Sequence, residues 1–282
     1  MAAKSDDSLT KLAVRQRDIA DYVVAQGSVT PASLAERFGV SLMTVHRDLA
    51  ELAQRGVVRK HRGGVTAQPS SVFESHLAFR KNRSRAAKNT IALEARKLVE
   101  PGMSVLLDDS TSALALAELL HDAMPITIIT NFLEIIRLVT PWPDARVIAL
   151  GGEYNPAHDS FLGVPCVDAI ARLRADVLFT STSTVQDGYA LHQEQEIVFV
   201  KRAMLQSAQR RVLLVDHTKL GRSALHRVAP LSDFDDVITD DGAPDDVLES
   251  LRESRIPITV ARPPAAQASV RTRAGQPVEQ TE

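Results

Sequence analysis

The sequence predicts an α/β protein in two parts: a small helical N-terminal domain ending in a β-hairpin, and a larger domain with a mostly parallel sheet. Two observations lead to this prediction. Apolar residues recur at helical spacing up to about residue 55, and a basic Gly-Gly turn follows. From about residue 89, short strand and helix patterns alternate instead. We therefore expect domains at 1–66 and 89–262, a basic linker and helix at 67–88, and a disordered tail at 263–282.

The first two helices of the N-terminal domain are defined by their end signals. The stretch RQRDIADYVVAQG carries apolar residues on one face and stops at Gly27. After the short extended piece SVT, Thr30 supplies an N-cap and Pro31 the first residue of a second helix, PASLAERF, which ends at Gly39. The side chains expected in this part of the core are Ile19, Tyr22, Val23, Leu34, Ala35 and Phe38.

A third helix is predicted after its N-cap, Ser41. Val45, Leu49 and Leu52 follow i, i+4, i+7 spacing and face the core, so the polar residues near the helix start lie on the opposite surface. Two short helices joined through FGVS form a helix-turn-helix. The basic hairpin RKHRGG then makes it a winged helix-turn-helix.

The exposed face of the third helix has the chemistry of a helix that reads DNA. In a helix-turn-helix, the start of the recognition helix contacts base edges in the major groove. Thr44 suits a phosphate or a thymine methyl, Arg47 suits a guanine edge or a phosphate, and a basic wing adds salt-dependent affinity. His46 fits a DNA contact and a passive surface position equally well, and Asp48 is expected to pair with the wing's arginines, because a carboxylate repels phosphate. The predicted DNA-binding residues are Ser41, Met43, Thr44, His46, Arg47, Arg59, Lys60 and Arg62.

Composition and charge agree with a DNA-binding head on a domain that has another task. The 282 residues are 44% hydrophobic and 24% charged, and the net charge is −2. That value conceals net charges of +3 over residues 1–66, +4 over 67–88 and −9 over 89–282. No apolar stretch approaches the roughly 18 residues of a membrane span, and the N-terminus has no signal core. Cys166 is the only cysteine, which excludes an internal disulfide and a cysteine-cluster zinc site. We expect a cytoplasmic protein with no membrane, metal or cofactor partner.

The larger domain is predicted from seven strand patterns with helical patterns between them. This alternation is typical of a mostly parallel sheet with helices on its faces. The strand patterns are MSVLLDD, ITIIT, RVIAL, DVLFTS, RVLLVD, DVITD and ITVA, and the helical patterns include ALALAELLHDA, FLEIIRLV and EIVFVKRAMLQSAQ.

The loops that follow these strands carry polar residues suited to a ligand. Ligands in open α/β sheets bind at the carboxyl ends of the strands, so we expect the loops to converge on one crevice. LLDDSTS places two aspartates and three hydroxyl residues before a helix, whose free N–H groups suit phosphate. TNF, LGG and DHTKLGR follow three further strands, and the glycines of LGG permit close approach of the backbone to a ligand.

The N-terminal part of the chain resembles the signature of DeoR-type bacterial transcription regulators, through the stretch RQRDIADYV followed, after seventeen residues, by SLMTVHRDL. The wing RKHRGGV also matches, and His46 stands where arginine is more usual. The resemblance covers roughly residues 12–262. In the larger domain, LDDSTS resembles the family motif LDxGTT, TNF resembles TNS, LGG resembles GG, and DHTKLGR resembles DxSKxGR. The stretch EIVFVKRAM also matches, with Lys201 at the position of the family lysine. Ser110, and Ser181 and Thr184 of FTSTST, replace family glycines, and their hydroxyls can donate hydrogen bonds instead.

The resemblance implies a repressor whose α/β domain, similar in fold to sugar-phosphate isomerases, senses a phosphorylated sugar or related metabolite without a catalytic residue. The expected partners are double-stranded operator DNA, a phosphorylated sugar or polyol effector, and copies of the chain in a homodimer or homotetramer, since operators usually contain two half-sites. The residues expected to bind the effector are Asp108, Ser110, Thr111, Ser112, Asn131, Gly151, Gly152, Ser181 and Lys219.

Two other functions stay open at this point. One is a sugar-phosphate isomerase-like enzyme with a DNA-binding head, which turnover of a sugar phosphate would reveal. Its acid–base groups would come from Asp108, Asp109, Glu194, Glu196, Lys201 and Lys219. The other is a ligand-independent DNA-binding protein, which fits the replaced glycines and predicts that no metabolite changes DNA affinity.

Overall fold

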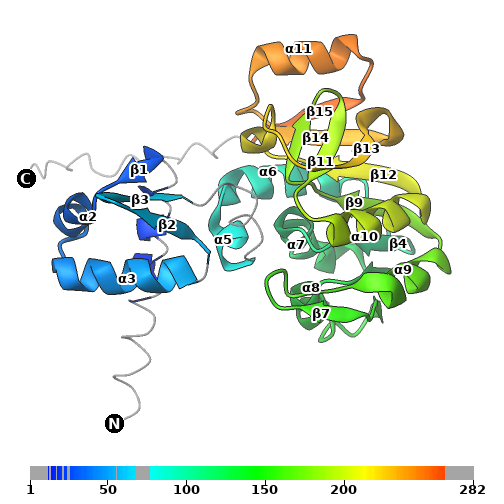
Figure 1. The fold of residues 1–282 in the computed structure, drawn as a ribbon. Helices are drawn as coiled ribbons and strands as arrows, with labels where there is room; N and C mark the ends of the chain where they lie inside the picture. The colour runs from blue at the N-terminus through cyan, green and yellow to red at the C-terminus, as the bar shows by residue number, and fades with distance from the viewer. Residues whose placement is uncertain are drawn as a thin grey trace, which may run out of the picture.

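The computed structural model describes residues 12–67, apart from Ala13, Arg17, Asp21, Val24, Ala25 and Arg55, and residues 77–263. They form a small N-terminal domain and a larger α/β domain (Figure 1). The segment 68–76 and, beyond its first residue, the expected disordered tail at 263–282 lie outside the described residues.

The N-terminal domain is the winged helix-turn-helix that the sequence predicts. Helical residues up to Gln26 precede a three-stranded antiparallel sheet of order β1-β3-β2 and two helices. The elements are β1 (Ser28–Val29), α2 (Pro31–Phe38), α3 (Leu42–Gln54), β2 (Val58–His61) and β3 (Gly64–Ala67). Their shared core contains Ile19, Val23, Leu34, Val45, Leu49, Leu52, Val58 and Val65.

The helix ends follow the expected local chemistry. The Thr30 hydroxyl accepts the Ser33 N–H at 3.1 Å, and Pro31 is the first residue of α2. Gly39 ends α2 with a left-handed φ of 63°. The Ser41 hydroxyl then accepts the Thr44 N–H at 3.1 Å, which caps α3. Local signals therefore set the turn between the two helices.

A seven-stranded sheet forms the centre of the larger domain. Its order is β15-β14-β12-β9-β4-β5-β6, and every neighbouring pair is parallel. Each strand lies within or overlaps one of the seven predicted strand patterns, so that prediction is confirmed. The strands are β4 (Ser104–Leu107), β5 (Ile126–Thr130), β6 (Ala145–Ala149), β9 (Ala175–Thr180), β12 (Ala208–Leu214), β14 (Asp236–Asp240) and β15 (Ile258–Ala261).

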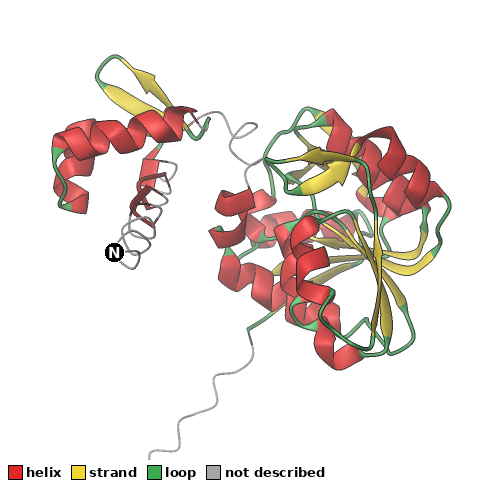
Figure 2. Cartoon of the chain, turned by 90° about the horizontal axis from the view of Figure 1, so that it is seen from below, coloured by secondary structure: helices red, strands yellow, loops and turns green. Residues whose placement is uncertain are grey.

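Helices cover both faces of this sheet (Figure 2). The helices on one face are α6 (Arg85–Arg96), α7 (Thr111–Ala117) and α8 (Leu133–Val139). Those on the other face are α9 (Gly163–Ala171), α10 (Gln195–Gln206) and α11 (Asp245–Glu253). Successive residues of β4 alternate between the two cores, with Val105 and Leu107 in one and Leu106 in the other. Burial on both faces explains the apolar runs in the inner strands, such as Val105–Leu107 of β4 and Val212–Leu214 of β12.

The elements that the sequence does not predict are mostly short. They include a hairpin, a small antiparallel sheet and three 3-10 turns. The hairpin consists of β7 (Glu153–Asn155) and β8 (Ser160–Leu162), and the small sheet of β10 (Thr184–Gln186), β11 (Tyr189–His192) and β13 (His226–Pro230). The 3-10 turns are η1 (Leu120–Ala123), η2 (His217–Lys219) and η3 (Leu231–Asp233). The strands of three residues, β7, β8 and β10, carry too little periodicity to stand out.

A short helix, α5 (Leu77–Asn82), precedes α6, and α6 runs through residue 88, the end of the expected basic segment. Within the described part of the chain, no helix is both long and apolar enough to cross a membrane.

Candidate functional site

Helix α3 turns one face to the core and the other to solvent. The exposed side carries Met43, which is 73% exposed, and the exposed His46 and Arg47. Thr44 is half-buried, and its hydroxyl lies 2.8 Å from that of Ser41. The side chains on the buried face are Val45, Leu49 and Leu52. The face predicted to read DNA is therefore accessible.

The wing places basic side chains in solvent. Arg62 and Gly63 form its tip, and Gly63 has a left-handed φ of 92°. A Cβ at Gly64 would lie 2.9 Å from the His61 ring and 3.0 Å from the Val29 carbonyl oxygen, so a larger residue there would crowd both groups. The exposed basic residues of the wing are Arg59, Lys60, His61 and Arg62.

Asp48 does not pair with the wing, contrary to the expectation from the sequence. It is fully buried, and its carboxylate accepts from Arg15 Nε at 2.7 Å and from Gln16 Nε2 at 3.3 Å. Asp48 follows Val45 by three positions and precedes Leu52 by four, which puts it on the buried side of α3. Its ion pair with Arg15 ties the first helix to the recognition helix.

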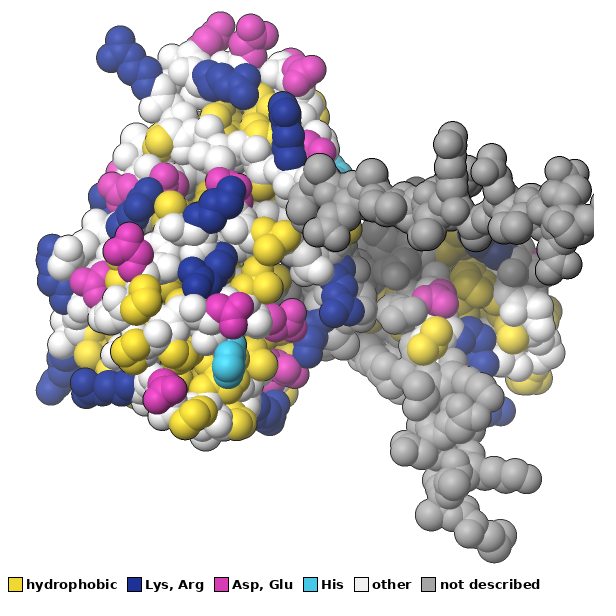
Figure 3. Space-filling view, turned by 180° about the vertical axis from the view of Figure 1, so that it is seen from behind, with side chains coloured by type: hydrophobic (Ala, Val, Ile, Leu, Met, Phe, Trp, Pro, Cys, Tyr) yellow, Lys and Arg dark blue, Asp and Glu magenta, His cyan; other side chains and the backbone are white. Residues whose placement is uncertain are grey.

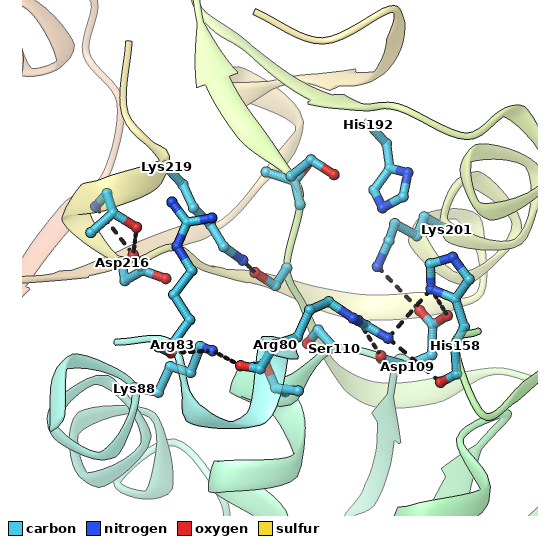
Figure 4. A pocket seen from close by; sticks show the side chains of 15 residues that line it. Arg80, Arg83, Lys88, Asp109, Ser110, His158, His192, Lys201, Asp216 and Lys219 are labelled. Carbon is cyan, nitrogen blue, oxygen red and sulfur yellow. Dashed lines mark hydrogen bonds and ion pairs between the residues drawn. The ribbon is translucent and has the colours of Figure 1, made fainter. Parts of the chain in front are cut away.

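A pocket lies at the carboxyl ends of β4, β9 and β12, three neighbouring strands of the large sheet (Figure 4). Its cavity has a volume of about 60 Å³. The charged residues that line it are five cations, Arg80, Arg83, Lys88, Lys201 and Lys219, and two carboxylates, Asp109 and Asp216. Its hydroxyl residues are Ser110, Thr111, Ser181, Thr182, Ser183 and Thr218. Basic and acidic side chains are interspersed on the outer face of the domain seen in Figure 3, whereas the pocket concentrates positive charge.

Asp108 anchors the loops that build the pocket. It is 1% exposed and forms a direct ion pair with the ammonium of Lys201. Its carboxylate also accepts the Ser110 N–H at 3.0 Å, the Thr180 hydroxyl at 2.6 Å and the Ser181 N–H at 2.9 Å. These bonds join the ends of β4 and β9 to α10, so Asp108 has a positioning role.

One end of the pocket groups Asp109 with cations and an imidazole. Lys201 Nζ is 3.6 Å from Asp109 Oδ1, and Arg80 donates to the Asp109 backbone carbonyl at 3.0 Å. The ring nitrogens of His158 lie 3.3 Å from Arg80 Nη2 and 2.9 Å from Glu194 Oε1. Burial by itself raises the pKa of Asp109, but the positive charges around it, Lys201 foremost, hold that pKa well below its ordinary value.

The opposite end of the pocket is lined mainly by cations. Lys219 Nζ donates to the Ser181 hydroxyl at 2.9 Å. Lys88 Nζ donates to the backbone carbonyls of Arg80 and Arg83 at 2.5 and 2.7 Å. Burial, reinforced by the charge of Lys219, lowers the pKa of Lys88 to about 7.

Four of the nine residues predicted to bind the effector line the pocket, namely Ser110, Thr111, Ser181 and Lys219. Asp108 holds the loops together, as described above. Ser112 is buried, and its hydroxyl makes no hydrogen bond within the described residues.

Asn131, Gly151 and Gly152 do not line the pocket. The amide of Asn131 donates to the Phe161 carbonyl at 2.9 Å, which ties the end of β5 to β8. A Cβ on Gly152 would lie 2.3 Å from the Leu162 carbonyl oxygen, so its close backbone contact is with the chain itself. The strand order explains this separation: β12, β9 and β4 are adjacent, whereas β5 and β6 lie beyond β4 towards one edge.

Several lining residues have no clear signal in the sequence. Arg80, Arg83 and Lys88 belong to the basic segment 67–88, which net charge singles out without indicating a pocket. His158 and His192 lie in or beside the short unpredicted strands. Tertiary structure alone brings these five residues to the site.

The pocket combines the chemistry of an anion site with hydroxyl groups that can both donate and accept hydrogen bonds. Burial, together with the charge of Lys201, lowers the pKa of His192 to about 3, so its ring is neutral at pH 7. No group of side chains that could hold a metal ion occurs within residues 77–263 or the described part of the N-terminal domain.

Two family models match the chain: a DeoR-like helix-turn-helix domain over residues 15–71 and a DeoR C terminal sensor domain over residues 83–241. The glycerol-3-phosphate regulon repressor of Escherichia coli (strain K12) is 31% identical over 86% of this chain and 96% of its own length. The lactose phosphotransferase system repressor of Staphylococcus epidermidis (strain ATCC 35984) is 31% identical over 80% of this chain and 91% of its own. A ribose 5-phosphate isomerase A structure from Methanocaldococcus jannaschii covers 48% of this chain and 54% of that one, with 19% identity and a TM-score of 0.36.

Proposed function

Because the chain belongs to the DeoR family of transcription regulators, we propose that its pocket binds a small phosphorylated sugar or polyol that controls operator binding by its winged helix-turn-helix. The observation that carries this proposal is the excess of basic side chains over carboxylates: five basic side chains line the pocket, against Asp109, Asp216 and the adjoining Asp108 that pairs with Lys201. A phosphate dianion offsets such an excess, and charge-assisted hydrogen bonds to it are stronger than neutral ones.

The two ends of the pocket suggest how the ligand lies. Lys88, Lys219 and Arg83 surround the end that suits the phosphate. Asp109 and His192 at the other end suit the hydroxyl groups of a sugar or polyol. The Asp109 carboxylate accepts hydrogen bonds, and the His192 ring, whose Nδ1 accepts the Glu194 N–H, can donate from Nε2. The small cavity favours a compact ligand.

The proposal includes binding without turnover. Isomerisation needs a base with a pKa near the working pH. Asp109 and His192 do not meet this requirement, because the pKa of Asp109 is well below its ordinary value and that of His192 is about 3. Lys88, with a pKa of about 7, does meet it, but its ammonium donates to two backbone carbonyls, so the turnover assay below is the test of this part of the proposal.

The DNA-binding part of the proposal rests on the exposed face of α3 and the wing. Met43, His46 and Arg47 are accessible to base edges, and the wing cations are accessible to phosphates. An operator with two half-sites calls for at least a homodimer in the cytoplasm, and a homotetramer is the alternative assembly.

Fluorescence anisotropy of the full chain on DNA from upstream of its own gene tests the proposal. The titrations are run with and without sn-glycerol 3-phosphate and a panel of sugar and polyol phosphates, with the unphosphorylated compounds as controls. We expect sequence-selective binding whose affinity one phosphorylated compound changes. Lys219→Met should abolish that change, whereas Lys97→Met, at the exposed position directly after α6, should keep it.

Selective DNA binding that is indifferent to every compound would overturn the sensor and favour the ligand-independent DNA-binding protein. Turnover of any compound in the panel would favour the enzyme. DNA binding without sequence preference would count against α3 as a recognition helix.

A further inference from the structure

Helix α5 is the first described element after the segment that follows the wing, and polar contacts hold it to the α/β domain. The Leu77 N–H donates to the Ala157 carbonyl at 3.0 Å, and Lys81 pairs with Glu134 at 3.0 Å. From the middle of α5, the Arg80 guanidinium reaches into the pocket. It donates there to the Asp109 carbonyl at 3.0 Å.

The end of α5 is capped by a side chain from the pocket. The last carbonyls of a helix lack partners within the helix. Lys88 of α6 provides the missing hydrogen-bond donor, because its ammonium donates to the carbonyls of Arg80 and Arg83. The Thr111 hydroxyl donates to the same Arg80 carbonyl at 3.3 Å. Arg80, Lys88 and Thr111 therefore both anchor α5 and line the pocket.

The charges make the docking of α5 sensitive to what occupies the pocket. Docking brings Arg80 and Arg83 close to Lys88 and Lys219, and like charges at short range repel in a buried site. Asp216 offsets part of this repulsion. An anion in the pocket offsets more of it, but only the docked helix places Arg83 beside that anion and the Arg80 guanidinium at the other end of the same pocket. The anion therefore binds the docked arrangement more tightly than the undocked one.

We propose that α5 is a ligand-dependent wall of the effector site, so that anion binding and the docking of α5 on the α/β domain stabilise each other. The inference rests on the pocket assigned under the proposed function and adds its route of regulation. Effector binding reaches the chain between the two domains directly at Leu77, because α5 begins there. Differential affinity for two arrangements of one helix is sufficient for such a switch.

Hydrogen–deuterium exchange of the full chain tests the inference, with inorganic phosphate and sn-glycerol 3-phosphate as probes and calorimetry to measure their binding. Exchange of a helix amide reports its local opening. We expect amides of residues 77–88 to exchange more slowly with a bound probe. The slowing of exchange should reach at most about a hundredfold at a ligand concentration 100 times Kd. Sodium chloride at matched ionic strength should not reproduce the effect.

Two variants separate direct contact from linkage. Arg80→Ala should speed exchange over residues 77–88 in the free protein and weaken probe binding about tenfold or more. Arg80→Lys, which keeps the charge, serves if the alanine variant does not fold. Lys81→Glu acts outside the pocket by opposing Glu134. It should speed exchange in the free protein and weaken probe binding, whereas Lys97→Ala should change neither.

The two proposals fail in different ways. A probe that binds the wild type while exchange over residues 77–88 stays unchanged would overturn the role of α5 and leave the effector pocket intact. Probe affinity that Arg80→Ala and Arg80→Lys leave unaltered would do the same. Absence of calorimetric binding by every phosphorylated compound would overturn the pocket itself, and the role of α5 with it.

Discussion

The protein has two groups of cations, and they differ in exposure and in origin. The cations of the DNA face are exposed and come from one stretch of 16 residues, Arg47 to Arg62. Those of the pocket come from α5, the turn after it, α6, α10 and η2. Lys201 among them is 3% exposed and contacts two buried carboxylates. Removing a cation from the first group should affect partner binding alone, whereas removing one from the second should also affect stability.

The largest expected effect is on stability and comes from Lys201→Met. This change leaves Asp108 and Asp109 as buried carboxylates without their ammonium partner. Breaking a buried ion pair in this way costs about 3–5 kcal/mol. Urea denaturation of the α/β domain should show a decrease of that size in the free energy of unfolding. Lys97→Met is the matched control, with a change within about 0.5 kcal/mol. A fully stable Lys201→Met variant would show that hydrogen bonds alone satisfy Asp108.

Arg47→Ala should weaken operator binding by about 1–3 kcal/mol, since a well-placed arginine contributes that much to base discrimination. Its side chain is exposed, so the free energy of unfolding should change by no more than about 0.5 kcal/mol. Fluorescence anisotropy and urea denaturation measure the two quantities. Arg146→Ala, at an exposed position on β6, should change neither. A large loss of stability in Arg47→Ala would erase the contrast between the two groups.

The pocket should also show a pH dependence that the DNA face lacks. Lys88 has a pKa of about 7 in the free protein, and it is faced by Lys219, Asp216, Arg80 and Arg83. A bound phosphate favours the ammonium form and raises that pKa, so binding takes up a proton above pH 7. The second ionisation of a phosphomonoester, with a pKa of about 6, is complete by then.

Affinity for sn-glycerol 3-phosphate should therefore fall between pH 7 and pH 9, by at most about tenfold per pH unit. Calorimetry across this range measures it. Lys88→Met should bind more weakly at pH 7 and show a flat profile above it. Affinity that rises with pH in the wild type would remove Lys88 from the anion end of the pocket.

The smallest expected effect concerns the wing. Replacing both Arg59 and Arg62 by alanine should make the dependence of log K on log salt shallower, by about 0.9 for each DNA phosphate that the wing no longer neutralises. Sequence preference should persist because the wing cations act on the backbone. Anisotropy titrations at several salt concentrations measure this slope. An unchanged slope would show that the wing does not bind phosphates.

Much of the fold follows from local patterns. The Thr30 and Ser41 caps, the left-handed Gly39 and the apolar repeat of α3 each depend on a few neighbouring residues. Each of the seven strands of the sheet contains an apolar run that alternates with helical patterns along the chain, and this combination can be recognised in the sequence. The strands β7, β8 and β10 have three residues each and are too short for such a pattern. The lining residue His158 lies between β7 and β8, and His192 ends the small unpredicted strand β11.

The winged helix-turn-helix, its exposed basic face and the parallel α/β domain can all be predicted from the sequence, because each depends on residues close in the chain. Which loops share a pocket depends on how the strands and helices pack. The ends of β4, β9 and β12 meet because these strands are neighbours, and α5 adds Arg80 from a different part of the chain. Strand order also places Asn131 and Gly151 outside the pocket, and helix packing makes Asp48 form its ion pair with Arg15 and not with the wing. Such pairings depend on contacts between residues far apart in sequence, which periodicity and spacing do not encode.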